Sequence, residues 1–201
     1  MKRLFTAVAV ALVGSGAFAF DPADLKKLNE TNECEGCNLS NAELFNDDLT
    51  KANLIGANLT DANLTGANLT GANLNLANLT NAKLSYANLT GANLTDANMS
   101  KTWLIEADLI NAEMSNANLS NSNMIGADLT GTNLSSANLS DTDLTYANLI
   151  GTDLSFVDLI FARMKGVIFC DTTMPDGNVK NTAAKLSSGK NCRNAIMSSP
   201  T

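Results

Sequence analysis

A five-residue spacing of apolar residues constrains the fold of this chain more than any other feature. Leu or Met occupies every fifth position from Leu39 to Met164, which makes 26 consecutive repeats. The typical unit is Ala-Asn-Leu-Thr-Gly, and its variants keep a small residue, usually Ala, two places before the central Leu or Met. Apolar residues five apart match neither the 3.6-residue period of a helix nor the two-residue period of a strand. Such a fixed period predicts a solenoid in which each unit stacks on its neighbours.

A five-residue unit is too short to form a whole coil, so we expect each unit to form one side of a coil. Ala and Leu, two positions apart, then both face inward, while the remaining three residues face solvent or a corner. Four sides would close a coil of about 20 residues, whose backbone pairs with the coils above and below at about 4.8 Å. Ladders of Leu and Ala would fill the centre.

The unit Ala57-Asn58-Leu59-Thr60-Asp61 and its copies resemble the signature A-(N/D)-L-x-x of the pentapeptide-repeat family. The resemblance implies that family's fold, an all-β, right-handed quadrilateral β-helix, over residues 37–169. It implies no shared activity, because members are mostly non-enzymatic and a fold does not define a function. Two further blocks, Cys34-Glu35-Gly36-Cys37 and residues 169–177, resemble the ends of exported members from cyanobacteria and other bacteria.

Residues 1–19 have the features of a signal peptide. Lys2 and Arg3 precede a short apolar run, and Ala17-Phe18-Ala19 offers the small-x-small pattern that signal peptidase cuts. The run is too short to span a bilayer comfortably. We expect cleavage after Ala19 and export to the periplasm, to the thylakoid lumen of a cyanobacterium, or out of the cell. No membrane-inserted segment would then remain; the alternative is an uncleaved anchor.

The repeats are flanked by two segments that we expect to cover the ends of the solenoid. Residues 20–36 contain helix-start chemistry, with Asp21 as cap, Pro22 at the first helical position and Asp24 in the first turn. Leu25 and Leu28 can face the solenoid together. Residues 170–201 form the C-terminal cap or tail, in which Met174-Pro175-Asp176-Gly177 predicts a turn.

Export makes the four cysteines candidates for disulfides. In the solenoid, Cys37 and Cys170 would be separated by more than six coils, about 32 Å at the inter-coil spacing, whereas disulfides need Cα atoms within about 7 Å. We therefore predict Cys34–Cys37 and Cys170–Cys192 bonds. The same distance argues against a four-cysteine zinc site. A thioredoxin-like redox motif would need a βαβ context that the sequence lacks.

We expect no catalytic site, cofactor or metal. The chain has no His, and no Ser or Cys stands in a recognisable nucleophile motif. Irregular outward residues gather instead on the side centred on Leu44, Leu64, Leu84, Leu104 and their successors. They form a candidate patch for a protein partner of unknown identity: Phe45, Lys83, Tyr86, Trp103, Ile105, Glu106, Ile125 and Tyr146. The alternative is that these are ordinary scattered surface residues.

Charge and surface composition leave two lesser alternatives. The net charge is −7, and some pentapeptide-repeat proteins are acidic rods that mimic DNA and occupy a topoisomerase. Export argues against that function here, and against any nucleic-acid partner. Columns of Ser and Thr, such as Thr60, Thr80 and Ser100, could instead bind ice or glycan. We expect a monomer or a homodimer paired through one side.

Overall fold

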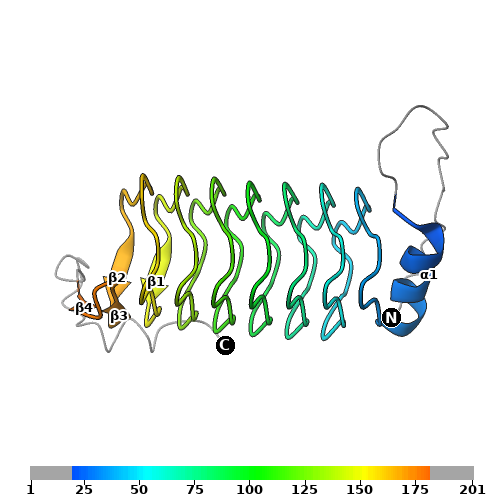
Figure 1. Cartoon of the computed structure of the whole chain (residues 1–201), viewed down its shortest axis with the longest axis horizontal. Coiled ribbons are helices and arrows are strands. Elements are labelled where there is room, and N and C mark those ends of the chain that lie inside the picture. Colours follow the sequence, from blue (N-terminus) through cyan, green and yellow to red (C-terminus); the bar gives the residue numbers. More distant parts are fainter. Residues whose placement is uncertain (1–19, 182–201) are drawn as a thin grey trace.

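The structure, a computed structural model, describes residues 20–181 and has the form of a straight rod of stacked coils (Figure 1). Helix α1 (Pro22–Thr31) lies at the N-terminal end of the rod. At the other end, β1 (Asn148–Ile150) pairs in parallel with β2 (Ile168–Cys170), and β3 (Thr172–Thr173) pairs antiparallel with β4 (Val179–Lys180). The signal peptide predicted for residues 1–19 lies outside the described residues. Within the described part, no helix is long and apolar enough to cross a membrane.

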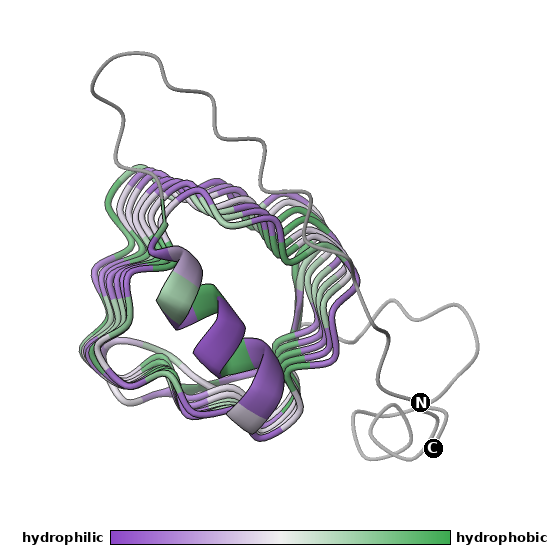
Figure 2. Cartoon of the chain, turned by 90° about the vertical axis from the view of Figure 1, so that its right-hand side faces the viewer, coloured by the Kyte–Doolittle hydropathy of each residue, from purple (hydrophilic) through white to green (hydrophobic). Residues whose placement is uncertain are grey.

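Each coil contains 20 residues. Parallel bridges join residues 20 positions apart along the whole rod, from Glu33 with Asn53 to Asp153 with Thr173. The view along the rod shows a four-sided outline that repeats coil after coil (Figure 2). We name the sides by the central residues of one circuit, as the Leu44, Leu49, Leu54 and Leu59 sides. The predicted four-sided solenoid is confirmed, although regular strands are few, because a corner follows every five residues and limits most pairing to one residue.

The core consists of the stacked Leu and Ala side chains. Leu84, Leu104 and Ala82 are fully buried, as are nearly all their counterparts between Leu39 and Leu154. Burial of each Leu contributes roughly 1.5–3 kcal/mol before the loss of chain entropy is subtracted. Backbone bonds join neighbouring coils beside this core; for example, the Leu84 N–H donates to the Trp103 carbonyl at 2.7 Å. Each unit therefore depends on the coils above and below it.

The corners explain why Gly and Asn recur at the fifth position. Residues at this position have left-handed backbone conformations, such as Asn41 with φ 59° and Gly66 with φ 68°, and Gly and Asn tolerate this region best. Gly66 also leaves room for the side chain of Asn46 from the coil below, which would have to move if residue 66 carried a Cβ.

The Asn and Thr of the common unit bond to each other. The Thr60 amide and hydroxyl both donate to the Asn58 Oδ1, at 3.2 and 2.7 Å, and the same pair of bonds joins Thr80 to Asn78. This is a local Asx motif that fixes the backbone before each corner. The recurring Asn-Leu-Thr triplet thus has a structural cause in the turn.

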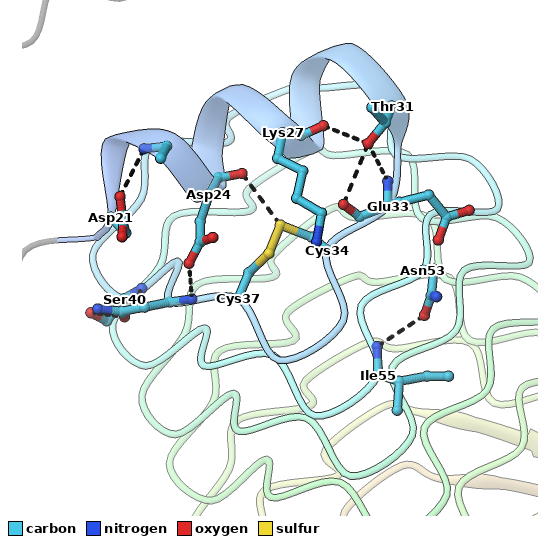
Figure 3. The surroundings of a disulfide bond; sticks show 12 residues. Asp21, Asp24, Lys27, Thr31, Glu33, Cys34, Cys37, Ser40, Asn53 and Ile55 are labelled. Atoms are coloured by element: carbon cyan, nitrogen blue, oxygen red, sulfur yellow. Dashed lines mark hydrogen bonds between the residues drawn. A yellow bond between two sulfur atoms is a disulfide. The ribbon is translucent and has the colours of Figure 1, made fainter.

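At the N-terminal end, α1 lies across the first coil (Figures 2 and 3). Asp21 caps the helix by accepting a hydrogen bond from the Ala23 amide at 2.8 Å, and Leu28 is buried. The Asp24 carboxylate accepts a hydrogen bond from the Asn38 amide at 2.8 Å, which ties the helix to the coil. Leu25 also packs against the core. The helix therefore covers the end, as its sequence predicts.

The predicted Cys34–Cys37 disulfide is present, with Cα atoms 5.2 Å apart (Figure 3). Cys34 stands at the place of the central Leu and Cys37 at that of Ala, and both are buried. The first bridge involves Glu33, so the predicted solenoid boundary at residue 37 is too late. The two cysteines already belong to the first coil.

At the C-terminal end the solenoid continues past the predicted boundary at residue 169. Asp153 bridges Thr173 one coil above, and only then does the chain turn back through Met174–Gly177 into β4. The predicted turn is present, since the Met174 amide donates to the Asn178 carbonyl at 2.8 Å. Cys170 is buried and disulfide-bonded. Its expected partner Cys192 lies outside the described residues, and that pairing stays a prediction.

Candidate functional site

Three successive coils bring most of the predicted patch together on the Leu44 side. Lys83 and Trp103 are bridge partners in adjacent coils, and Trp103 bridges Asn123 above. The Tyr86 amide donates to the Ile105 carbonyl, and the Glu106 amide donates to the Ile125 carbonyl, each at 2.9 Å. We call this group of six residues the Trp103 cluster: Lys83, Tyr86, Trp103, Ile105, Glu106 and Ile125.

The two remaining predicted residues, Phe45 and Tyr146, do not belong to this cluster. Phe45 precedes Ile105 by 60 positions and therefore lies three coils away. Tyr146 is exposed, but its ring lies against Gly166 in the next coil, where a Cβ would come within 2.5 Å of the ring. Tyr146 thus has a packing role that explains its presence at the corner.

Exposure within the Trp103 cluster is uneven. The Trp103 side chain is 52% exposed and that of Tyr86 60% exposed, whereas Ile105 and Ile125 are partly buried. Lys83 lies one coil below Trp103, a placement that would allow a cation–π contact, but none forms between them. Among residues 20–181, such a contact joins Lys180 Nζ to the Phe169 ring at 4.1 Å. Among the described residues, no cation therefore lies over the Trp103 ring.

Tyr86 occupies a corner that favours other residues. Its φ is 62°, in the left-handed region that costs a non-Gly residue about 1–2 kcal/mol. Because the other corners share this conformation, the feature that distinguishes Tyr86 is its exposed ring and not its φ.

Sequence reasoning missed several exposed apolar residues near the C-terminal end. Phe156 and Phe161 are each 81% exposed, at corners with φ 58°, and Ile160 lies between them in the chain with 57% exposure. Leu76 is a similar exposed corner residue on the Leu54 side. The sequence did mark these corners, because a large apolar residue stands at the fifth position, where Gly, Asn, Asp or Ser is usual. Their exposure was not predicted, because the repeat does not show that the fifth residue lies at an exposed corner.

Carboxylates on the rod are spread rather than clustered. Within the described residues, no group of three or more His, Cys, Asp or Glu side chains is arranged to hold a metal. Burial, together with the charge of Asp128 one coil above, raises the pKa of Asp108. The pKa of Asp143 is lowered, because hydrogen bonds from Thr145 and the charge of Arg163, 3.5 Å away, outweigh the opposing effect of burial.

The Ser and Thr columns of the Leu59 side are partly occupied by internal bonds. The hydroxyls of Thr60, Thr80 and Ser140 each donate to the Asn two residues earlier at 2.6–2.7 Å. A ligand such as ice or glycan would have to use the remaining acceptor capacity or displace these bonds. This arrangement weighs against a flat array of free hydroxyl donors.

Comparison with known proteins defines the class to which this rod belongs. The family model for pentapeptide repeats matches eight copies, over residues 33–75, 72–109, 97–135 and 137–174. The chain is a member of the pentapeptide-repeat family. No curated protein matches it.

Several solved structures are similar. HetL, a pentapeptide repeat protein involved in heterocyst differentiation regulation from the cyanobacterium Nostoc sp. Strain PCC 7120, shares 30% identity over 74% of this chain and 76% of its own, with a TM-score of 0.46. A pentapeptide repeat protein from the Arabidopsis thaliana thylakoid lumen shares 32% identity over 58% and 74% of the two chains, with a TM-score of 0.47. QnrB1, a plasmid-mediated fluoroquinolone resistance protein, shares 20% over 66% and 72%, with a TM-score of 0.41.

Proposed function

We propose that this protein is an exported, non-catalytic scaffold that binds a protein partner through the Trp103 cluster. The observation that carries the proposal is that two exposed aromatic residues, Tyr86 and Trp103, lie in adjacent coils of the Leu44 side. Gly or Asn at the Tyr86 corner would satisfy the fold at lower cost. A surface aromatic pair on a rigid lattice offers a partner a large apolar contact with little loss of side-chain entropy.

The residues of the Trp103 cluster indicate what kind of protein surface would complement it. The Trp103 and Tyr86 side chains are more than half exposed, and Ile105 and Ile125 add partly buried aliphatic surface. Lys83 and Glu106 are exposed at its margin. A complementary protein surface would bring an apolar or cationic side chain over the indole ring and place opposite charges at the rim.

Export is supported by two features of the chain. The first is the signal-peptide pattern of residues 1–19. The second is the buried Cys34–Cys37 disulfide within the first coil, a kind of bond that persists in oxidising compartments and is rare in the cytosol. The periplasm, or the thylakoid lumen in a cyanobacterium, fits both features.

The proposal is tested by capture of partners from an exported-protein fraction on the immobilised mature protein. A triple variant, W103N/I105T/I125T, replaces three apolar residues of the cluster with residues that the repeat uses at those positions. The matched control, I55T/L76N/I110T, removes a similar apolar surface from the Leu54 and Leu49 sides. We expect loss of capture for the first variant and retained capture for the second. Equal capture by both variants, with unchanged thermal unfolding, would exclude the Trp103 cluster as the binding surface.

A further inference from the structure

The four sides of the rod differ in their balance of charge. Over residues 33–173, acidic residues outnumber basic ones on the Leu49, Leu54 and Leu59 sides. On the Leu44 side the two signs balance, with Lys83, Arg163 and Lys165 against Glu43, Glu106 and Asp143. Because like charges repel, a second copy of this acidic chain can approach the Leu44 side at lower cost than any other side.

The Leu44 side also has the apolar surface that an interface needs. Phe45, Tyr86 and Trp103 are each more than half exposed, and Ile105 and Ile125 are partly buried between the coils. Exposed aromatic residues on a surface without excess charge are typical of protein–protein contacts. The rod is straight (Figure 1), so two such sides can meet along their length.

Lys83 and Trp103 offer a contact that the single chain leaves unmade. They stand in adjacent coils, both are exposed, and no cation–π contact joins them. In a two-fold interface, a contact from one residue to another is repeated in the opposite direction. If two rods lie antiparallel, with the axis midway between these two coils, each Lys83 faces Trp103 of the second copy. The interface then gains two cation–π contacts.

The same register places compatible residues along the rest of the side. Asn63, one coil below Lys83, comes opposite Asn123 of the second copy, which lies one coil above Trp103. Arg163 lies 3.5 Å from Asp143, and this pair comes opposite Glu43 of the second copy, so the guanidinium is shared by two carboxylates. A parallel arrangement would instead bring each charged residue against its own copy, which disfavours it.

We propose that the Trp103 cluster binds a second copy of this chain, with the two rods antiparallel and Lys83 of each over the Trp103 ring of the other. This inference rests on the function proposed above for the cluster and names its partner. The Leu44 sides form the interface, and the three acidic sides of both rods remain in solvent.

Sedimentation equilibrium of the mature protein over a range of concentrations tests the pairing. We expect a concentration-dependent dimer for wild type. K83E and W103N should each lower the dimer association constant at least about tenfold, because the two-fold axis makes each substitution remove a contact twice. The matched control K51E makes the same charge change at the corner after the Leu49 side and should leave the association constant close to that of wild type.

Chemical cross-linking tests the orientation of the two rods. Facing residues of two packed sheets lie about 10 Å apart, within reach of a short bismaleimide. An equimolar mixture of N63C and N123C chains should therefore cross-link, because these positions face each other. N63C alone should not, because its two copies would also be separated by three coils along the rod.

A wild-type protein that stays monomeric at all concentrations would overturn this inference. Dimers that K83E and W103N weaken no more than K51E does would also overturn it, as would efficient cross-linking of N63C alone. The protein-binding function of the cluster is judged separately: if wild type is monomeric but W103N/I105T/I125T still loses capture of an exported protein, the cluster binds a different partner.

Discussion

The two ends of the rod differ in how completely they are closed. At the N-terminal end, α1 lies across the first coil, Leu28 is buried, and Asp24 accepts a hydrogen bond from the Asn38 amide. At the C-terminal end, the described chain adds a layer to two sides and leaves residues 157–166 uncovered. One end thus resembles the interior of the solenoid, and the other retains an edge.

This difference shows what a repeat protein needs besides its repeat. Every internal unit is satisfied by identical neighbours, so its residues are set by the lattice. A terminal unit has one neighbour fewer and requires a segment of different sequence. The departures from Ala-Asn-Leu-Thr-Gly in this chain are therefore most informative near the ends, where exposed edges invite association.

We expect the largest loss of unfolding free energy when a core Leu at the closed end is replaced by Ala, and a smaller loss for the equivalent change at the open end. Leu39 is fully buried in the first coil, so L39A should lower the free energy of unfolding by about 2–5 kcal/mol. Leu159 is partly exposed in the last coil, and L159A should cost less than half as much. Denaturant unfolding followed by circular dichroism measures both. Equal losses would show that Leu159 is covered by another segment or a second copy.

Removal of the Cys34–Cys37 disulfide at the closed end should give the second-largest loss of unfolding free energy. For a loop of four residues, the chain-entropy relation gives about 2 kcal/mol, so C34S/C37S should lose about that amount of unfolding free energy. The control C34L/C37A inserts the residues that the repeat itself uses at these places and should recover more than half of the loss. If C34L/C37A is no better than C34S/C37S, the bond matters for a reason other than filling the first coil.

The repeat sequence was sufficient to predict the architecture. A five-residue spacing with Leu59 and Ala57 both facing inward indicates one unit for each side of a coil, and the resemblance to the pentapeptide-repeat family supported four sides. The capping role of Asp21 and the burial of Leu28 could be read from local rules for helix starts. The Cys34–Cys37 bond followed from the length of the rod.

The surface and the ends were harder to predict, for physical reasons. Cys34 and Cys37 fit the positions of Leu and Ala, but two cysteines in place of an apolar pair hid the start of the first coil. The left-handed conformation at the corners depends on how the sides join, which composition does not state. Without that knowledge, Phe156 and Phe161 looked like ordinary irregularities, and the packing of Tyr146 on Gly166 could not be foreseen.

Replacement of a bulky corner residue should raise the unfolding free energy, by less than the two losses above. F161N inserts the residue found two coils below at the same corner, Asn121, and removes an exposed Phe from a left-handed conformation. We expect a gain of up to about 1 kcal/mol in unfolding free energy. The contrasting variant Y146G should bring no gain, because it removes a ring that packs on Gly166. A loss of stability in F161N would indicate that Phe161 is buried by an unseen contact.

The smallest expected change in stability concerns Asp108 and Asp143, which each stand directly before the central Leu of a repeat. Asp108 lies in the middle of the rod and Asp143 near its open end. The pKa of Asp108 is raised by burial and by the neighbouring charge of Asp128. Its folded state therefore binds a proton more tightly than its unfolded state does, and ionised Asp108 destabilises the fold. D108N should raise stability slightly at neutral pH, and this gain should vanish as the pH falls below the carboxyl range.

Asp143 should behave in the opposite way. Its pKa is lowered, since the hydrogen bonds from Thr145 and the Arg163 charge together outweigh burial. It contributes stability above the unfolded pKa, and that contribution is lost as the pH falls through the folded pKa. D143N should therefore lower stability at neutral pH and have no effect in acid, by a small amount because Arg163 is largely exposed. Thermal unfolding from neutral to acidic pH distinguishes the two variants: opposite signs that converge in acid support the assignment, whereas parallel curves would mean that the Asp128 and Arg163 charges do not reach these carboxylates.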